Sequence, residues 1–188
     1  MDADQQRAAV LGAAEKLFYG RGIQAVGMDE IRTAAGVSLK AIYKLFPSKD
    51  SLVAQVLAIR DRRWTEGLHR HVDRAHDPEA KVLAIFDWLD EMFAEDDFRG
   101  CSFINSYGEM GATSPTVAEA AQHNKTCYQD ELAGLVADAG LPDRVAVQVG
   151  LLTEGALATA AILGPDGVTD GARDAARVLM DANRRVGS

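Results

Sequence analysis

The sequence has few of the features that mark secreted, disulfide-bonded or membrane-anchored proteins. Its 188 residues contain only two cysteines, Cys101 and Cys127, which are too few for a disulfide framework. The N-terminus lacks the positively charged start and apolar run of a secretory signal. The longest apolar stretch, from Val145 to Leu163, is interrupted by polar residues, which favours a buried helix over a bilayer span. We therefore expect a cytoplasmic protein without a membrane anchor.

Strand signals are lacking as well. No segment alternates apolar and polar residues as a half-buried strand does, and no Asn-Gly pair marks a hairpin. Apolar residues instead recur at steps of three and four, the period of one helix face. The fold class is therefore expected to be all-α. The predicted helices cover residues 4–19, 28–35, 39–46, 49–76, 81–95, 101–110, 115–139, 143–163 and 170–186.

Capping residues mark several of these boundaries. Gly36 follows the second helix, where a left-handed residue costs least in glycine. Ser38, Ser48, Ser114 and Thr169 each precede a predicted helix and are suited to be its N-cap. These local signals predict where the chain turns, independently of its tertiary packing.

Charge is unevenly distributed along the chain. The formal net charge of −8 at first argues against a nucleic-acid partner, because duplex DNA is itself a polyanion. Residues 1–60, however, hold eight Lys/Arg and six Asp/Glu, a net charge of +2, which leaves −10 for the remainder. A basic head on an acidic body would direct the head toward DNA. The alternative is a chance split in a modestly acidic protein.

Two short helices joined through Gly36-Val37-Ser38 have the outline of a DNA-binding helix-turn-helix. In the second of them, Lys40, Tyr43 and Lys44 share one face, because they are three and four residues apart. Lysines pair with phosphates or guanine acceptors, and a tyrosine hydroxyl donates to phosphate. This pattern predicts a surface that lies in a major groove. The alternative is a helix face that is polar only because it is solvated.

Two further residues complete the predicted surface. Ala41 is small enough for the helix to approach base edges and to touch a thymine methyl group. Lys49 begins the next helix, where both its ammonium and its backbone N–H are suited to phosphate binding.

A longer run of sequence resembles the N-terminal domain of the TetR/AcrR family. The resemblance lies in Ala34-Ala35-Gly36-Val37-Ser38 and in Tyr43-Lys44-Leu45-Phe46-Pro47-Ser48-Lys49, at this separation. It implies an N-terminal helix-turn-helix domain and a helical ligand-binding and dimerisation domain, and Pro47 marks the boundary between them, which divides the chain into residues 1–48 and 49–188. It also implies a homodimer on a palindromic double-stranded operator, usually as a repressor released by a small-molecule effector, with no enzymatic activity and no cofactor.

By the same resemblance, operator contacts are expected from Met28, Lys40, Ala41, Tyr43, Lys44 and Lys49. The sequence departs from the family pattern at two positions. Gly27 stands where Ser or Thr is usual, so a capping hydroxyl that would also reach a phosphate is missing. Arg32 stands where Ala is more frequent, and it is either a substitute charge or a solvated side chain.

The remaining two-thirds of the chain has no motif of comparable specificity. The family resemblance implies an internal cavity there, and aromatic and polar side chains are available to line it. The candidates are Trp64, Trp88, Phe103, Tyr107, His123, Cys127 and Glu154. The alternative for each aromatic is an ordinary place in the core.

The last two predicted helices are rich in glycine and alanine, which let helices approach closely. This composition predicts that the homodimer forms through the pair, as a four-helix interface between two copies. The alternative is a pair that packs only within one chain.

The same part of the chain leaves other functions open. His123 and Cys127 share a helix face and, with Glu109 or Glu154, have ligand types suited to a transition metal or a metal-assisted hydrolase, but no nucleophile and base spacing supports an enzyme. A protein-interaction module is a third reading. Redox sensing by either cysteine lacks support, because the sequence places no activating charge beside a thiol.

Overall fold

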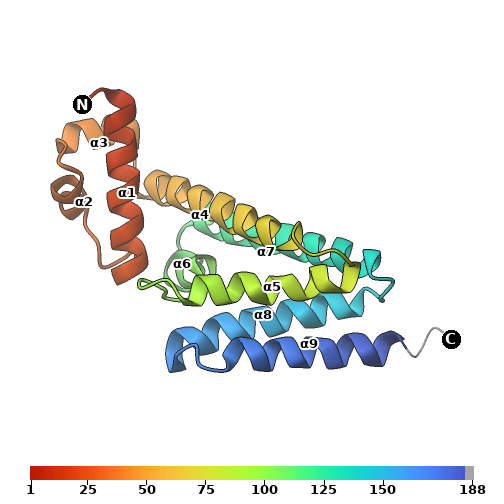
Figure 1. Ribbon diagram of the computed structural model, residues 1–188. Coiled ribbons are helices and arrows are strands. Elements are labelled where there is room, and N and C mark those ends of the chain that lie inside the picture. Colours follow the sequence, from red (N-terminus) through yellow and green to blue (C-terminus); the bar gives the residue numbers. More distant parts are fainter. Residues whose placement is uncertain (185–188) are drawn as a thin grey trace. The chain divides into compact units, whose positions relative to one another are not determined.

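The computed structural model describes residues 1–184, and in that range every regular element is a helix (Figure 1). The all-α prediction is therefore confirmed. The helices are α1 (Ala3–Arg21), α2 (Met28–Ala35), α3 (Leu39–Leu45), α4 (Lys49–Val72), α5 (Pro78–Phe93), α6 (Ser102–Met110), α7 (Pro115–Asp138), α8 (Arg144–Leu163) and α9 (Val168–Arg184). The predicted end of the last helix, Val186, lies outside the described residues.

The predicted caps of the first helices are present. Gly36 is left-handed, with φ 66°, at the end of α2. The Ser38 hydroxyl accepts a hydrogen bond from Ala41 N at 3.2 Å, and the Ser48 hydroxyl accepts one from Ser51 N at 3.1 Å. Each hydroxyl satisfies a backbone donor that the first turn of a helix leaves without a partner.

The boundaries of α4 and α9 differ from the prediction. α4 ends at Val72 rather than at His76, because the chain tightens into a turn in which Ala75 N donates to Val72 O. α9 starts at Val168, so Thr169 is inside the helix and buried, and the prediction that it is the cap was wrong. Gly167 precedes the helix with φ 72°, and its carbonyl accepts from Gly171 N.

The chain divides into two compact units, each described here by itself. Unit 1 comprises residues 1–62 and 102–124, and unit 2 comprises residues 63–101 and 125–188, of which 185–188 are not described. α4 and α7 each contribute residues to both units. The predicted domain boundary between residues 48 and 49 coincides with the start of α4. That residues 1–48 and 49–188 form separate domains stays a prediction.

Unit 1 has a small apolar core under the first three helices. Val10 and Phe18 of α1, Ile31 of α2 and Ile42 of α3 are all buried, and Phe46 closes the core after α3. Burial of side chains of this size stabilises the fold by about 1.5–3 kcal/mol each. This core holds the two short helices, which are too short to be stable alone.

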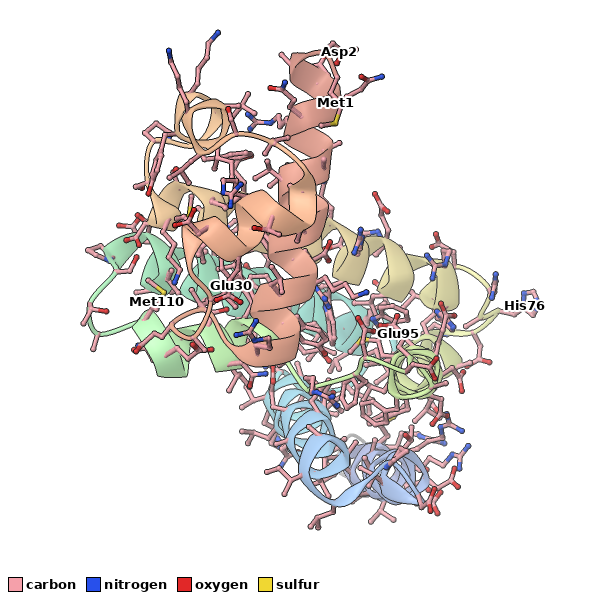
Figure 2. The ribbon with its side chains drawn as sticks, turned by 90° about the vertical axis from the view of Figure 1, so that its left-hand side faces the viewer. Met1, Asp2, Glu30, His76, Glu95 and Met110 are labelled. Atoms are coloured by element: carbon pink, nitrogen blue, oxygen red, sulfur yellow. The ribbon has the colours of Figure 1, made fainter. Side chains whose placement is uncertain are left out.

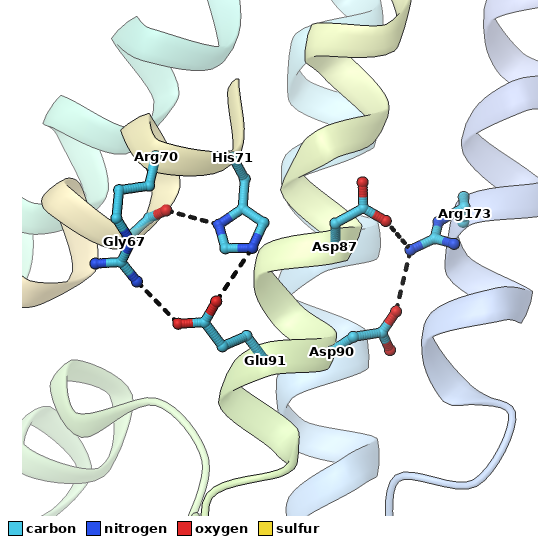
Figure 3. A network of polar contacts seen from close by, with 7 residues as sticks. All are labelled: Gly67, Arg70, His71, Asp87, Asp90, Glu91 and Arg173. Atoms are coloured by element: carbon cyan, nitrogen blue, oxygen red, sulfur yellow. Dashed lines mark hydrogen bonds and ion pairs between the residues drawn. The ribbon is translucent and has the colours of Figure 1, made fainter. Parts of the chain in front are cut away.

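Unit 2 has a larger core between α5, α8, α9 and the second halves of α4 and α7. Polar contacts tie α5 to its neighbours on both sides (Figure 3). Toward α9, Arg173 lies 2.6 Å from Asp87 and 3.1 Å from Asp90. Toward α4, the Glu91 carboxylate lies 2.8 Å from Arg70 and 3.2 Å from His71.

α8 is long and apolar enough, by length and composition, to cross a membrane. In the structure it packs against α5 and α9, and 44% of its apolar window is buried inside the fold. Val145, Val149 and Leu157 lie in the core of unit 2. This is the position of a core helix, as the interruptions in its sequence predicted.

Gly67 of α4 is a position where any larger residue would clash. A Cβ atom there would lie 2.4 Å from the indole ring of buried Trp88. We expect Gly67→Ala to destabilise the protein by about 1–3 kcal/mol, because overpacking displaces the indole even though alanine favours helix. Denaturant unfolding measures this change.

Gly134→Ala is the matched control for that variant. Gly134 is also inside a helix, α7, but a Cβ there meets nothing within 4 Å. Alanine there should leave stability unchanged or raise it by up to about 1 kcal/mol. Equal stability changes for the two variants would contradict the expected clash at Gly67.

Candidate nucleic-acid interface

The α2–α3 pair is fixed from beneath by its apolar residues. Ile31 and Ile42 have no exposed surface, and Val37, in the turn between the helices, is 9% exposed. The left-handed Gly36 lets the chain reverse over two residues before Ser38 caps α3. The local sequence thus sets the turn, and the core beneath it sets which face of α3 points outward.

The outward face of α3 holds the three side chains that the spacing predicted. Lys40, Tyr43 and Lys44 are exposed, and 46% of the Tyr43 surface is accessible to solvent. An exposed aromatic ring between two lysines is a poor arrangement for solubility alone and a good one for phosphate contact. Their exposure is as predicted, and contact with DNA by these three residues stays a prediction.

The other predicted contact residues lie in less open positions. Met28 begins α2, Ala41 is in the first turn of α3, and both are half-buried. The ammonium of Lys49 donates a hydrogen bond of 2.6 Å to the Val26 carbonyl and lies 5.8 Å from the centre of the Phe18 ring. Lys49 therefore ties α4 to the loop before α2. A phosphate contact by Lys49 stays a prediction that now rests on its backbone N–H.

The start of α2 is stabilised without the missing hydroxyl. Gly27 occupies the cap, and its N–H donates to the Glu30 carboxylate at 3.3 Å. Glu30 also forms an ion pair with Arg21 at the end of α1, and Figure 2 shows Glu30 beside that helix. The hydrogen bond from Arg21, followed by that from the Gly27 N–H, lowers the pKa of Glu30. Arg32 is exposed and pairs with Asp29 at 3.2 Å.

Glu109, near the C-terminal end of α6, holds the loop between α1 and α2. Its carboxylate accepts a hydrogen bond from Gln24 N at 2.9 Å, and its carbonyl accepts one from the Gln24 side chain. Gly22 has φ +89°, and a Cβ there would lie 3.1 Å from the carboxylate oxygens. The sequence suggested Glu109 as a metal ligand, whereas the structure uses its carboxylate to anchor the helix-turn-helix.

Three of the predicted pocket residues belong to unit 1. Phe103 is buried, with 5% of its surface exposed, whereas 56% of Tyr107 is exposed. His123 is exposed on α7. A groove between α1 and α2 is also present in unit 1, and its lining residues are Ala8, Ala9, Gly12, Ala13, Lys16, Leu17, Arg21, Ala34 and Ala35. The groove is therefore lined by residues other than the predicted pocket set.

The other four predicted pocket residues belong to unit 2. The rings of Trp64 and Trp88 meet edge to face with their centres 6.1 Å apart. Trp64 also meets Tyr128, whose buried hydroxyl donates to the Thr153 hydroxyl at 2.9 Å; burial raises the pKa of Tyr128. Glu154 is half-buried, and Cys127 is exposed on α7.

A metal site does not form around the histidine and cysteine of α7. Within residues 1–184, no group of three or more His, Cys, Asp or Glu side chains is arranged to hold a metal ion. The residue that sequence reasoning missed is Lys125, which lies on the same helix between His123 and Cys127. Its ammonium pairs with Glu154 at 2.6 Å. No local signal in the sequence identifies this pair, because its members are 29 residues apart.

Comparison with known proteins supports the helix-turn-helix reading. Residues 10–56 match the family described as "Bacterial regulatory proteins, tetR family". The HTH-type transcriptional activator FasR of Mycolicibacterium smegmatis is 33% identical over 145 residues, which cover 73% of this chain. The alignment spans 62% of the length of FasR, and 50% of the length of a second relative, the regulator SrpR of Pseudomonas putida.

Solved structures resemble almost the full length of the chain. A TetR-family transcriptional regulator from Streptomyces coelicolor, SCO4454, superimposes with a TM-score of 0.90 at 25% identity and covers 96% of each chain. A putative TetR transcriptional regulator from Streptomyces avermitilis superimposes with a TM-score of 0.84 at 28% identity, covering 95% of this chain and 98% of its own. The resemblance therefore extends beyond the helix-turn-helix to the helices that follow it.

Proposed function

Since this chain belongs to the TetR family of bacterial regulatory proteins, we propose that it is a dimeric DNA-binding regulator of transcription in the cytoplasm, without enzymatic activity. We propose further that it is a repressor, released from a palindromic operator by a small-molecule effector. The name of the Mycolicibacterium relative describes an activator. Expression of a reporter gene placed behind the operator distinguishes repression from activation.

The observation that carries the proposal is the outward face of α3. Lys40, Tyr43 and Lys44 are exposed on a helix whose opposite face, at Ile42, is completely buried. A helix anchored in this way has the diameter to enter the major groove, which is about 12 Å wide. Its basic groups then meet phosphates while Ala41 faces base edges.

Dimerisation is proposed through α8 and α9. Val147, Leu151 and Ile162 lie along one side of α8 with 55%, 68% and 79% of their surfaces exposed, and Val178 of α9 is 67% exposed. Single exposed apolar residues are ordinary, but a stripe along a helix marks an interaction surface. Exposed Gly155 and Ala158 lie between them and permit close approach of a second copy.

Effector binding is proposed in unit 2. Among the buried side-chain atoms of unit 2 that lack a hydrogen-bond partner are Nε1 of Trp88, Oε1 of Gln148 and Oε2 of Glu154. Leaving a buried polar group unsatisfied costs about 1–3 kcal/mol. A small molecule with an acceptor for the indole and donors for the two oxygens would remove part of that cost. The proposed ligand is therefore a mixed apolar and polar compound that contacts Trp64 and Trp88.

The direct test is selection of bound fragments from random duplex DNA with the purified chain, followed by affinity measurements at several salt concentrations. We expect an enriched inverted repeat whose half-sites are one helical turn apart. We also expect the logarithm of the affinity to fall linearly with the logarithm of the salt concentration. Failure to enrich any sequence, or binding that is insensitive to salt, would overturn the proposal.

A further inference from the structure

Three polar side chains come together in unit 2 around the ammonium of Lys125. Its Nζ lies 3.2 Å from Sγ of Cys101 and 2.6 Å from Oε1 of Glu154. Cys101 is half-buried, packs against the apolar core and is not in a disulfide. The structure thus places a positive charge beside the Cys101 thiol, and the sequence alone did not reveal this arrangement.

The contacts of Lys125 keep its cation in place. Burial by itself lowers the pKa of Lys125, but the neighbouring Cys101 sulfur and the Glu154 carboxylate outweigh burial and raise it. The side chain therefore stays protonated at neutral pH. Glu154 fixes the ammonium on one side, which leaves the other N–H bonds to face the sulfur.

We propose that Cys101 is a reactive thiol that is alkylated by α,β-unsaturated carbonyl compounds, with Lys125 as its positioning residue. Reactive cysteines lie beside cations in partly exposed positions, and the Lys125 ammonium lies 3.2 Å from the Cys101 sulfur. The apolar surroundings of Cys101 favour a carbon electrophile with an apolar body. All three side chains belong to unit 2, and the test of this proposal does not depend on operator binding.

The chemistry of the step is a conjugate addition. The sulfur attacks the β-carbon, a C–S bond forms and the C=C π bond breaks, and its electron pair moves to the carbonyl oxygen as an enolate. The thiol proton passes to water before the attack, and water returns a proton to the α-carbon of the enolate, while Lys125 stays protonated and holds the sulfur in position. The product is a thioether and a saturated carbonyl compound, and no oxidant or reductant is consumed.

The second cysteine of the wild-type chain, Cys127, serves as an internal control for the alkylation rate because it is exposed. Exposure alone predicts that Cys127 reacts first. The folded protein is treated with less than one equivalent of N-ethylmaleimide at neutral pH, and peptide mass spectrometry follows each cysteine. We expect Cys101 to be alkylated about tenfold faster than Cys127. A rate at Cys127 that equals or exceeds that at Cys101 would overturn the proposal.

Substitution of Lys125 tests the part that the cation plays. In Lys125→Gln we expect the rate at Cys101 to fall about tenfold and the rate at Cys127 to stay constant, whereas Lys125→Arg should retain most of the wild-type rate. Circular dichroism confirms that each variant is folded. An unchanged Cys101 rate in folded Lys125→Gln would refute the role of the ammonium, and the wild-type comparison remains decisive if that variant does not fold.

Discussion

The double variant Tyr43→Ala/Lys44→Ala is expected to bind its selected operator about 100-fold more weakly than the wild type, or worse, because each DNA contact contributes about 1–3 kcal/mol and a dimer loses it twice. The fold should be unaffected, since both side chains are exposed and leave the buried core of unit 1 intact. Fluorescence anisotropy with the selected duplex measures the affinity, and thermal unfolding measures the fold.

Salt dependence distinguishes the loss of phosphate contacts from a general loss of binding. The slope of log affinity against log salt should become shallower by about one for each phosphate contact removed. Lys81→Ala is the matched control, because it removes the same charge from α5, outside the helix-turn-helix. The proposal for α3 fails if the double variant retains the wild-type affinity and slope, or if Lys81→Ala weakens binding equally.

The pair Leu151→Asp/Val178→Asp is expected to convert the dimer into monomers. These residues are 68% and 67% exposed on α8 and α9, so a single chain tolerates the carboxylates in water. In the proposed interface, each unpaired charge would have to be buried at a cost of several kcal/mol. We expect the dimer dissociation constant to rise at least about 100-fold and operator affinity to fall with it.

Analytical ultracentrifugation over a range of protein concentrations measures this change. The control is Ile104→Asp, which places a carboxylate at another exposed apolar residue, 46% exposed on α6. It should leave the sedimentation of the protein unchanged. A double variant that sediments as the wild-type dimer would show that the two copies meet through another surface.

Much of the helix-turn-helix could be predicted from sequence because its signals are local. The α2 boundaries, the left-handed Gly36 and the Ser38 cap all follow from residues within one or two turns of each other. The outward direction of Lys40, Tyr43 and Lys44 follows from the helical period once Ile42 is placed in the core. The error at Thr169 has a local cause as well, since α9 begins at Val168, directly after Gly167 and two residues earlier than predicted.

The helices that follow the helix-turn-helix could be predicted only in outline. The aromatic residues near Trp64 were recognised by composition, and the structure brings Trp88 and Tyr128 against that ring. Composition does not state which side of a helix faces the core, however. His123 and Cys127 share a face, as their spacing required, but that face is exposed.

By itself, the sequence determined the helical class, the turns and the outward face of α3, because periodicity and capping act between residues that are close along the chain. Only the tertiary structure decided that the Lys49 ammonium binds the Val26 carbonyl, that Glu109 anchors the loop at Gln24, and that Lys125 lies beside Cys101. Each of these contacts joins residues more than 20 positions apart. Which residues meet in these contacts depends on how whole helices pack, and burial of apolar area drives that packing. No short sequence motif encodes it.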